Sequence, residues 1–297
     1  MKSVAIIGAG ITGLTAAFYL KRKGVTVTVF EAANRAGGVI QSRRQNGFLA
    51  EFGPNTILET SPKIPQLIRD LNLKSRKIYP SPNAKKRFLV RDKKIIAMPS
   101  SPIGFLATKL FSAKSKLAVL REPFVPARRD GADESVAEFV TRRLNREFLE
   151  RAVNPFVAGI YAGDPEKLSV RHAFPKLFEL EQKYGSLIRG QIFGAKDGKK
   201  SGEIARNRAK MFSFDEGLQV LTDALAEQIG DSLKLNSPAA KIAQTESGLK
   251  IFTANGELNF DAVIYCGTAH KLAVLEMENV TLTRPAATLS HPMGEGR

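Results

Sequence analysis

The chain has 297 residues, which at about 150 residues per domain suggests two domains. Its hydrophobic fraction (43%) and charged fraction (25%) are ordinary for a globular protein and argue against intrinsic disorder, a collagen-like chain and a multi-span membrane protein. The 45 basic residues outnumber the 29 acidic ones, and the net charge of +16 points to an anionic partner: nucleic acid, an acidic membrane surface, or a ligand bearing phosphate or carboxylate.

The excess charge is concentrated in two segments. Residues 84–130 contain twelve basic and three acidic residues, and residues 196–210 contain six basic and two acidic residues. The clusters of basic residues lack aromatic interleaving and no recognition motif accompanies them, so nucleic acid is disfavoured as a partner. The single cysteine, Cys266, excludes an intramolecular disulfide and fits a reducing compartment. No metal site is expected, because the histidines lie far apart in the sequence: His172, His270 and His291.

A βαβ unit is predicted at the N-terminus, with strands at 4–7 and 25–30 and a helix at 14–23. Between the first strand and the helix stands a G-x-G-x-x-G loop formed by Gly8, Ala9, Gly10, Ile11, Thr12 and Gly13. Such glycines permit a tight turn, a close approach to pyrophosphate and close helix–strand packing. The helix N-terminus would bind pyrophosphate oxygens, and Glu31 can accept both hydroxyls of an adenosine ribose. This pattern favours a dinucleotide-binding domain over a secretory signal peptide.

The next residues distinguish between dinucleotides. Residues 31–38 form the pattern E-x-x-x-R-x-G-G, which is followed by Val39. The candidate cofactor-binding residues in this stretch are Glu31, Ala32, Arg35, Gly37, Gly38 and Val39. The pattern resembles the flavin amine oxidase and protoporphyrinogen oxidase superfamily, in which the arginine and paired glycines continue the wrap around FAD. In that family the residue after the second glycine is often basic, whereas here it is Val39. The resemblance favours FAD over NAD.

Helices are predicted in the middle of the chain, at 102–111, 113–122, 136–152 and from 170 onward. Their N-caps are Ser101, Ser112, Ser135 and Ser169. Proline follows the first cap, and Glu138 completes a capping box with Ser135. The first helix carries lysines and an apolar set, Ile103, Phe105, Leu106, Leu110 and Phe111, which fits either a membrane interface or a core with solvated lysines. The chain has no run of 18 apolar residues, so a spanning helix is excluded.

Three further segments resemble protoporphyrinogen oxidases over about residues 3–275. The first is the glycine–proline segment with which these enzymes approach the flavin, here Gly53, Pro54, Asn55 and Thr56. The second is residues 154–169, close to P-F-V-x-G-x-x-x-G-D-P-x-x-L-S, and the third is residues 212–221, close to S-F-x-G-G-x-Q-x-L. In the third segment Glu216 stands in place of the first glycine.

Short strands are predicted beyond residue 230, with an Asn255-Gly256 hairpin turn. Residues 262–267 read as a buried strand returning to the nucleotide-binding sheet, and residues 196–210 as an exposed loop. Residues 281–297 show no periodicity and read as a tail, whereas family members continue well beyond this point. We therefore hypothesise a truncated reading frame.

The resemblance implies an α/β fold with a Rossmann-like FAD-binding domain of the glutathione-reductase type and an inserted, mainly helical substrate- and membrane-binding domain. The expected parts are 1–75 and 211–280 for the FAD-binding domain, 76–210 for the insertion and 281–297 for a tail outside the family. The segments at 8–13, 31–39 and 53–56 are expected to bind FAD, as is Ala239, whose counterpart often contacts the adenine. Arg87 is implied to bind a propionate carboxylate, and Gly159 to let the macrocycle lie against backbone.

The expected function is FAD-dependent oxidation of protoporphyrinogen IX to protoporphyrin IX in haem biosynthesis, with O₂ as the electron acceptor. No catalytic acid–base pair is nominated, and FAD carries the redox chemistry. The expected location is the cytoplasm, with peripheral contact to the inner face of the cytoplasmic membrane, and a homodimer is one expected state. Three alternatives stay open: coproporphyrinogen as the substrate, an amine-oxidase-like flavoenzyme, and a non-catalytic fragment that retains the adenosine-side contacts.

Overall fold

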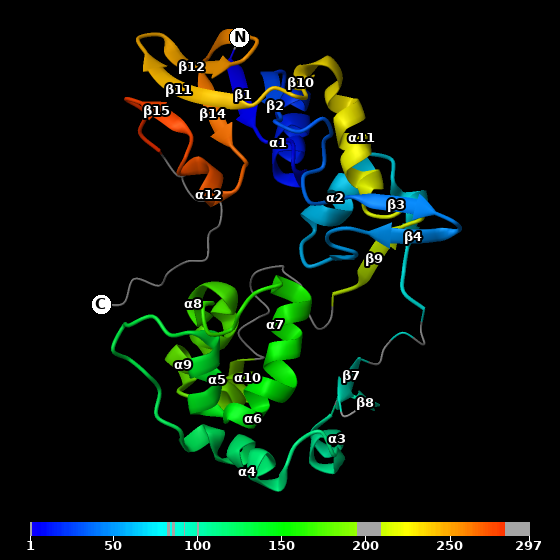
Figure 1. The fold of residues 1–297 in the computed structure, drawn as a ribbon, viewed down its shortest axis with the longest axis vertical. Helices are drawn as coiled ribbons and strands as arrows, with labels where there is room; N and C mark the ends of the chain where they lie inside the picture. Colours follow the sequence, from blue (N-terminus) through cyan, green and yellow to red (C-terminus); the bar gives the residue numbers. More distant parts are fainter. Residues whose placement is uncertain are drawn as a thin grey trace. The chain divides into compact units, whose positions relative to one another are not determined.

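The structure is a computed structural model that describes residues 2–81, 84, 87–91, 93–99, 101–194 and 209–282. The described residues divide into two compact units, one made of residues 2–79 and 209–282 and the other of residues 80–194 (Figure 1). The second unit falls within the expected insertion, 76–210. Of the expected exposed loop, residues 196–208 lie outside the described residues, as do residues 283–297 of the expected tail.

A four-stranded parallel sheet organises the first unit. Its strand order is β10 (Leu233–Lys234), β2 (Thr26–Phe30), β1 (Ser3–Ile7) and β14 (Ala262–Tyr265). Helices α1 (Ile11–Arg22) and α11 (Gln219–Ile229) share one core with Val4, Ile6, Val27 and Val29 of this sheet. The predicted N-terminal βαβ unit is thus confirmed, with element bounds shifted by one to three residues.

A second sheet packs against the opposite face. Its order is β13 (Gly256–Phe260), β12 (Gly248–Thr253), β11 (Ala239–Thr245) and β15 (Glu276–Glu278). Ala5 and Phe30 of the parallel sheet form a core with Ile242, Ile251 and Phe260. The predicted Asn255-Gly256 hairpin is confirmed, since β12 and β13 pair antiparallel and Gly256 has a φ of +117°.

The strand at 262–267 corrects one expectation. It does return to the sheet and pairs parallel with β1, but it is not a buried strand: Ala262 and Ile264 are exposed, and Val263 and Tyr265 are half-buried. The cause is its position, because β14 is the outermost strand of the described sheet.

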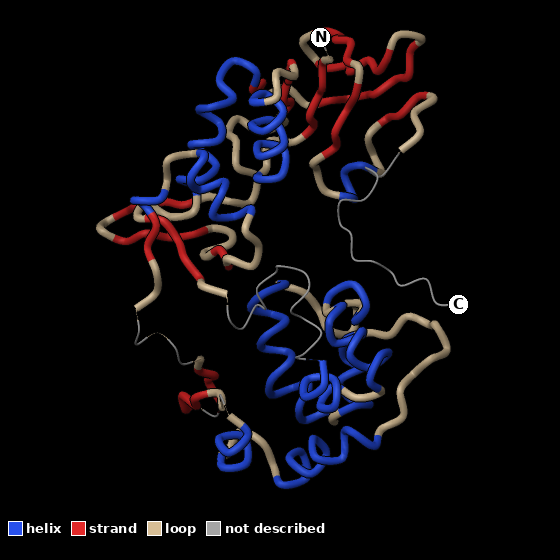
Figure 2. Tube along the Cα trace, turned by 180° about the vertical axis from the view of Figure 1, so that it is seen from behind, coloured by secondary structure: helices blue, strands red, loops and turns tan. Residues whose placement is uncertain are grey.

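Smaller elements complete the first unit. Strands β3 (Ser42–Gln45) and β4 (Phe48–Glu51) form a hairpin, and β5 (Ile57–Leu58), β9 (Met211–Phe214) and β6 (Lys77–Ile78) form a three-stranded sheet. Short helices α2 (Lys63–Asp70) and α12 (Ala269–Leu272) follow β5 and β14 respectively. Figure 2 shows strands gathered in this unit and helices dominating the other.

The second unit is mainly helical. One hairpin, β7 (Phe88–Arg91) and β8 (Lys94–Ala97), precedes its helices. The helices are α3 (Pro102–Ala107), α4 (Ala113–Arg121), α5 (Val136–Arg143), α6 (Arg146–Phe148), α7 (Asn154–Tyr161), α8 (Val170–Ala173), α9 (Pro175–Tyr184) and α10 (Leu187–Phe193), with a π-helical segment (Leu149–Val153) before α7. The four predicted serine N-caps are confirmed, including the capping box of Ser135 and Glu138.

Two predicted helices are shorter than expected. The first ends at Ala107, because Thr108 adopts an extended backbone and its hydroxyl accepts a hydrogen bond from the Leu110 N–H at 3.2 Å. Leu110 and Phe111 consequently turn into the core, where the Phe111 ring stacks on Phe148. The helix predicted over 136–152 is interrupted at residues 144–145, between α5 and α6.

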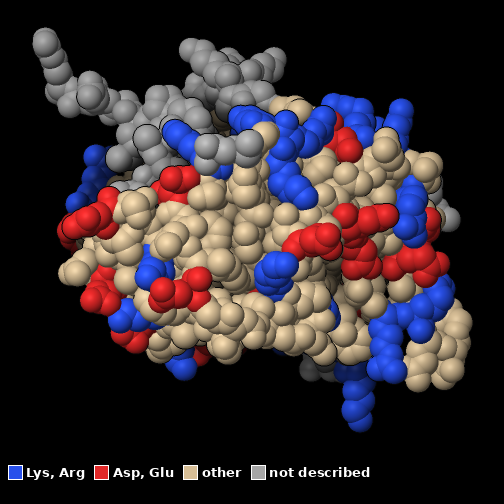
Figure 3. All heavy atoms as spheres, turned by 90° about the horizontal axis from the view of Figure 1, so that it is seen from above, with Lys and Arg blue, Asp and Glu red and all other residues tan. Residues whose placement is uncertain are grey.

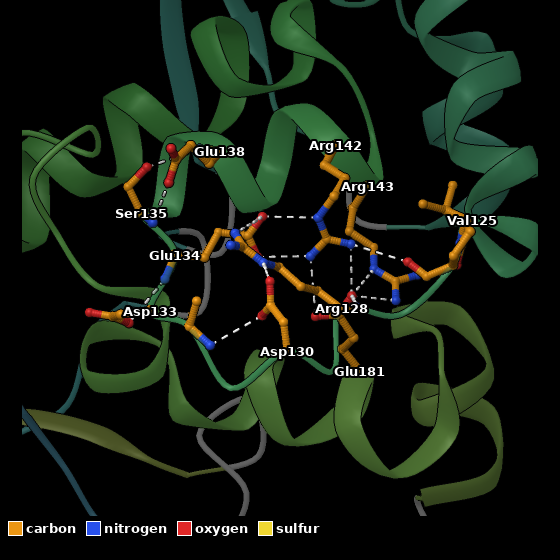
Figure 4. Close-up of polar contacts among 12 residues, drawn as sticks. Val125, Arg128, Asp130, Asp133, Glu134, Ser135, Glu138, Arg142, Arg143 and Glu181 are labelled. Atoms are coloured by element: carbon orange, nitrogen blue, oxygen red, sulfur yellow. Dashed lines mark hydrogen bonds and ion pairs between the residues drawn. The ribbon is translucent and has the colours of Figure 1, made fainter.

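Buried charge links the helices of the second unit (Figure 4). The Arg143 side chain is fully excluded from solvent and contacts Glu122 and Glu181, which are equally buried. Arg142 bridges Glu181 to Glu134. Because every carboxylate has a guanidinium partner, the charges are compensated within the core. No helix in the described part of the chain has the length and hydrophobicity needed to cross a bilayer.

Candidate cofactor-binding site

The glycine-rich loop between β1 and α1 is shaped by two glycines that the surrounding backbone requires. Gly8 has a φ of +102°, and a Cβ there would lie 3.2 Å from the backbone of Cys266 and Gly267. A Cβ on Gly13 would lie 2.0 Å from the Gly8 carbonyl oxygen. The tight turn and the close helix–strand packing predicted for these residues are therefore both present.

Gly10 is different, because a Cβ at this position would meet nothing within 4 Å. Gly10 is the N-cap of α1 and provides no side-chain oxygen for the N–H groups of the first turn, which also contains no acidic residue. The first turn of α1, which includes Ile11 and Thr12, therefore has N–H groups without an intrahelical or side-chain cap partner, and the Cβ position of the preceding Gly10 is open. An anion fits there, since the helix dipole and unpaired donors both favour negative charge.

Glu31, directly after β2, fixes the loop. Its Oε2 accepts a hydrogen bond from the Ala9 N–H at 2.7 Å, and its Oε1 accepts one from the Ala33 N–H at 2.9 Å. Its backbone carbonyl accepts a third from Ser237 at 2.8 Å. Each carboxylate oxygen keeps a lone pair after these bonds, so Glu31 can still accept ribose hydroxyls.

The second motif lies directly against the first. The Gly37 N–H donates to the Ala9 carbonyl at 2.8 Å, and a Cβ on Gly38 would lie 3.2 Å from the Gly10 Cα. Arg35 holds this loop in shape by donating to the backbone carbonyls of residues 36, 38 and 40. Because the guanidinium donates to the loop carbonyls, Arg35 would act on a cofactor indirectly, by holding the loop in shape.

The segment 53–56 meets the end of that loop. A Cβ on Gly53 would lie 2.0 Å from the Val39 carbonyl oxygen, so only glycine fits. Val39 is 77% exposed, and Ala32, Pro54, Asn55 and Thr56 are also exposed. Ala239 begins β11 and packs against the core around Phe30. The three predicted FAD-binding segments are therefore contiguous along one path, from Ala9 through Gly37 to Gly53.

One network at this site was missed from the sequence. Glu51 accepts hydrogen bonds from the Leu218 N–H (2.8 Å) and the Ser42 hydroxyl (2.6 Å), and the Ser42 N–H donates to Gln219 Oε1 at 3.0 Å. A Cβ on Gly217 would lie 2.4 Å from Ser42 Oγ. The family-like segment 212–221 contains Gln219, but no sequence signal indicated Ser42 or Glu51.

The two candidate substrate residues belong to the second unit. Arg87 is exposed just before β7, and its carbonyl accepts the Met98 N–H at 2.8 Å. Gly159 is exposed on α7, and a Cβ there would meet nothing within 4 Å. The β7 strand lines a cavity of about 740 Å³ together with Glu147, Arg151 and other side chains of this unit.

Other titratable groups give no further chemistry at the loop. Burial raises the pKa of the Cys266 thiol, which disfavours the reactive thiolate form. His270 Nε2 lies 3.2 Å from the Thr268 hydroxyl on the exposed start of α12. The described residues contain no group of three or more His, Cys, Asp or Glu side chains placed to hold a metal ion.

Comparison with known proteins identifies relatives over most of the chain. The family model described as flavin containing amine oxidoreductase matches residues 11–293. Protoporphyrinogen oxidase 2 of Arabidopsis thaliana is 37% identical over 257 residues, covering 82% of this chain and 50% of the relative. Coproporphyrinogen III oxidase of Bacillus subtilis is 31% identical over 295 residues, covering 92% of this chain and 61% of the relative. The chain thus spans about half to three fifths of these relatives' length.

Solved structures show the same fold. A protein from Exiguobacterium, provisionally named a protoporphyrinogen oxidase, superposes with a TM-score of 0.71 at 25% identity, over 92% of this chain and 61% of that one. Cyclohexylamine oxidase from Brevibacterium oxydans gives a TM-score of 0.64 at 19% identity, over 93% of this chain and 60% of its own. The chain has the mixed α/β, FAD-binding fold of the flavin amine oxidase type.

Proposed function

The chain belongs to the flavin containing amine oxidoreductase family, and from this premise we propose that its first unit binds FAD along the path from Ala9 through Gly37 to Gly53. The observation that carries the proposal is the open position at Gly10, beside an uncapped helix N-terminus. The adenosine ribose would hydrogen-bond to Glu31, and the pyrophosphate would lie against the first turn of α1. FAD, when bound, supplies the electron acceptor for substrate oxidation.

The protein's own residues shape the cofactor site. Arg35 stabilises the 36–40 loop through three backbone carbonyls, and Glu51 ties the β3–β4 hairpin to the start of α11. These contacts hold the loop glycines in positions that a flexible chain would not maintain, which reduces the entropy lost when a cofactor binds. The exposed segment 54–56 would then approach the flavin end.

The proposed reaction is the oxidation of a porphyrinogen to a porphyrin in haem biosynthesis, with O₂ as the final electron acceptor. The curated relatives named above support it, since one is a protoporphyrinogen oxidase and the other a coproporphyrinogen III oxidase. Arg87, exposed just before β7, would bind a propionate carboxylate through its planar guanidinium. Gly159 leaves open space above α7 where a macrocycle could lie. Coproporphyrinogen is the alternative substrate, because relatives of both kinds match most of this chain.

Peripheral membrane contact through α3 is part of the proposal. Ile103 is 81% exposed and Leu106 is 53% exposed, with Lys109 exposed nearby. Leu110 and Phe111 are buried, so the apolar surface offered here is smaller than the sequence suggested. The expected location at the inner face of the cytoplasmic membrane and the expected homodimer stay predictions. On the face drawn in Figure 3, basic and acidic side chains lie next to one another.

The test is direct. The purified chain is mixed with FAD, and binding is followed by quenching of flavin fluorescence. The loaded protein is then given protoporphyrinogen IX, coproporphyrinogen III or an amine under air, and porphyrin fluorescence or amine loss is recorded. FAD binding with porphyrin formation supports the proposal. FAD binding without turnover of any substrate supports the non-catalytic alternative, turnover of the amine alone supports an amine oxidase, and absence of FAD binding refutes the cofactor assignment.

A further inference from the structure

We infer that Lys77 is a positioning residue for segment 53–56, the part of the proposed FAD site that approaches the flavin, and that it acts through Glu59. The inference rests on the proposed function, because the segment matters for binding only if FAD follows the proposed path. Residues 54–56 are exposed, so packing against the core does not fix them. The contacts at the two ends of the segment therefore determine where it lies.

The two ends of this segment are held differently. Just before it, the Phe52 N–H donates to the Gln41 carbonyl oxygen at 2.8 Å. Just after it comes β5, an edge strand of two residues in the described three-stranded sheet. The Glu59 N–H extends the pairing by donating to the Lys210 carbonyl oxygen at 2.8 Å. A strand this short makes few backbone hydrogen bonds, so its anchoring depends on side chains as well.

Lys77 anchors β5 from the opposite edge of the same sheet. The central strand is β9, with β5 on one side and β6 on the other, and Lys77 is the first residue of β6. The Lys77 ammonium forms an ion pair with the Glu59 carboxylate. Its Nζ lies 4.1 Å from the centroid of the Phe212 ring, on β9, and 4.9 Å from that of Tyr79, and such aromatic faces attract a cation. One lysine thus ties the two outer strands together across the middle strand.

The ion pair is shielded from water. The Lys77 and Glu59 side chains are 9% and 15% exposed, and the Phe212 ring beside them is fully buried. Burial lowers the pKa of Lys77, but hydrogen bonds and charge interactions with Glu59 and Tyr79 outweigh burial and raise it. The lysine therefore stays charged at neutral pH, and solvent screens its attraction to Glu59 only weakly. Without the ammonium the Glu59 carboxylate would lack its compensating charge, so we expect it to turn toward solvent and displace β5.

Arg76 provides a matched comparison within the same sheet. It directly precedes Lys77 and pairs with Asp215, with Nη2 2.8 Å from Oδ1. Its side chain and that of Asp215 are 40% and 47% exposed, and Asp215 directly follows β9. The Arg76 pair therefore joins β6 to the end of β9 and does not reach β5. Loss of the Arg76 charge should leave segment 53–56 in place, whereas loss of the Lys77 charge should move it.

The experiment measures the binding of FAD and of ADP separately by titration calorimetry. ADP reports on the adenosine and pyrophosphate contacts proposed near Gly10 and Glu31, and the difference between FAD and ADP affinity reports on the flavin end. Lys77→Met keeps an unbranched side chain of similar length and removes the charge. We expect it to lower FAD affinity about tenfold while ADP affinity stays within about twofold. The visible spectrum of the bound flavin should shift toward that of free FAD, and Arg76→Met should change none of these quantities.

A second variant tests whether Lys77 acts through Glu59. Glu59→Gln removes the charge with little change of shape and should lower FAD affinity in the same way. The double variant should bind FAD as Lys77→Met does, because two groups that act as one unit do not have additive effects. Circular dichroism checks that each chain is folded. If Lys77→Met does not fold, the Glu59→Gln result decides, and unchanged FAD affinity in that variant would overturn the inference.

Other outcomes separate this inference from the proposed function. Unchanged FAD affinity in Lys77→Met, an equal loss in Arg76→Met, a parallel loss of ADP affinity, or additive effects in the double variant would overturn the role of Lys77 while the cofactor assignment stands. Failure of the unmodified chain to bind FAD would instead refute the cofactor assignment, and the inference with it.

Discussion

Arg143 and Glu122 form an ion pair that is completely removed from solvent, with Arg143 Nη1 2.9 Å from Glu122 Oε1. Glu122 also accepts hydrogen bonds from the Ser186 hydroxyl and from the N–H groups of Leu187 and Ile188, at the start of α10. One carboxylate thus compensates a buried guanidinium and caps a helix. We therefore expect Glu122 to contribute more to the stability of the second unit than its position in a short 3₁₀ turn would indicate.

We predict that Glu122→Ala lowers the free energy of unfolding by about 3–5 kcal/mol, because it leaves the Arg143 charge partly uncompensated in the core. Denaturant unfolding followed by circular dichroism measures the change. Arg146→Ala is the control, since the Arg146–Glu150 pair is exposed (61% and 56%) and such pairs contribute little. Equal effects of the two substitutions would contradict the assignment.

The stability of the second unit should fall at acid pH through Glu181. Burial raises the pKa of its carboxyl, but hydrogen bonds and charges from Arg142 and Arg143 outweigh burial and hold the pKa below the usual glutamate value. A lowered pKa in the folded state gives stability that is complete above the unfolded-state value of about 4.3 and is lost as pH falls through the folded-state pKa. Unfolding measured from pH 6 to pH 2 should show this loss, and Glu181→Gln should flatten that part of the curve. An unchanged profile in the variant would refute the role of Glu181.

Alanine substitutions at Gly10 and Gly13 should affect FAD binding and protein stability separately. Gly10→Ala adds a Cβ that meets nothing in the protein, so we expect an unchanged melting temperature but FAD affinity reduced by about tenfold, or about 1.4 kcal/mol. Gly13→Ala places a Cβ 2.0 Å from the Gly8 carbonyl, so we expect lower stability. Thermal melts and flavin fluorescence titration measure the two effects. A stability loss in Gly10→Ala equal to that in Gly13→Ala would contradict the open position.

Elements determined by neighbouring residues were predictable from the sequence, and those determined by distant residues were not. The βαβ unit, the Asn255-Gly256 hairpin and the capping box of Ser135 and Glu138 each depend on residues within one short segment. The Glu51–Leu218 hydrogen bond joins positions 167 residues apart, and no local pattern specifies such a pairing. The exposure of Ile264 likewise depends on which strand lies at the sheet edge, which an apolar run does not reveal.

The length of α3 illustrates a competing local interaction. The apolar spacing of Phe105, Leu106 and Leu110 favours a helix through residue 111, but the Thr108 hydroxyl offers the Leu110 N–H an alternative partner. Burial of Leu110 and Phe111 against Ala152 and Phe148 then stabilises the break. Packing energy from elements about forty residues later in the chain thus outweighed the helical periodicity.

We predict that Arg35→Lys weakens FAD binding without affecting the rest of the first unit. Lysine keeps the charge but presents one point donor instead of a planar fork, so it cannot bridge the carbonyls of residues 36, 38 and 40 together. FAD affinity should fall by about tenfold, while Arg22→Lys, on the exposed end of α1, should leave it unchanged. A titration showing the same affinity for both variants would exclude a positioning role for Arg35.

The membrane proposal predicts that charge on α3 reduces binding to acidic vesicles. Ile103 and Leu106 are the large exposed apolar residues of this helix. Full burial of each side chain in the membrane interface would contribute roughly 1.5–3 kcal/mol to the free energy of binding. Ile103→Glu combined with Leu106→Glu should therefore lower the vesicle-bound fraction at least about tenfold in a sedimentation assay. Leu258→Glu, in the first unit, introduces the same charge at an exposed apolar position and should leave binding unchanged. If binding to phosphatidylglycerol vesicles instead falls equally in the α3 double variant and in Leu258→Glu, the reduced binding is a general effect of net charge, and α3 is not the membrane-binding element.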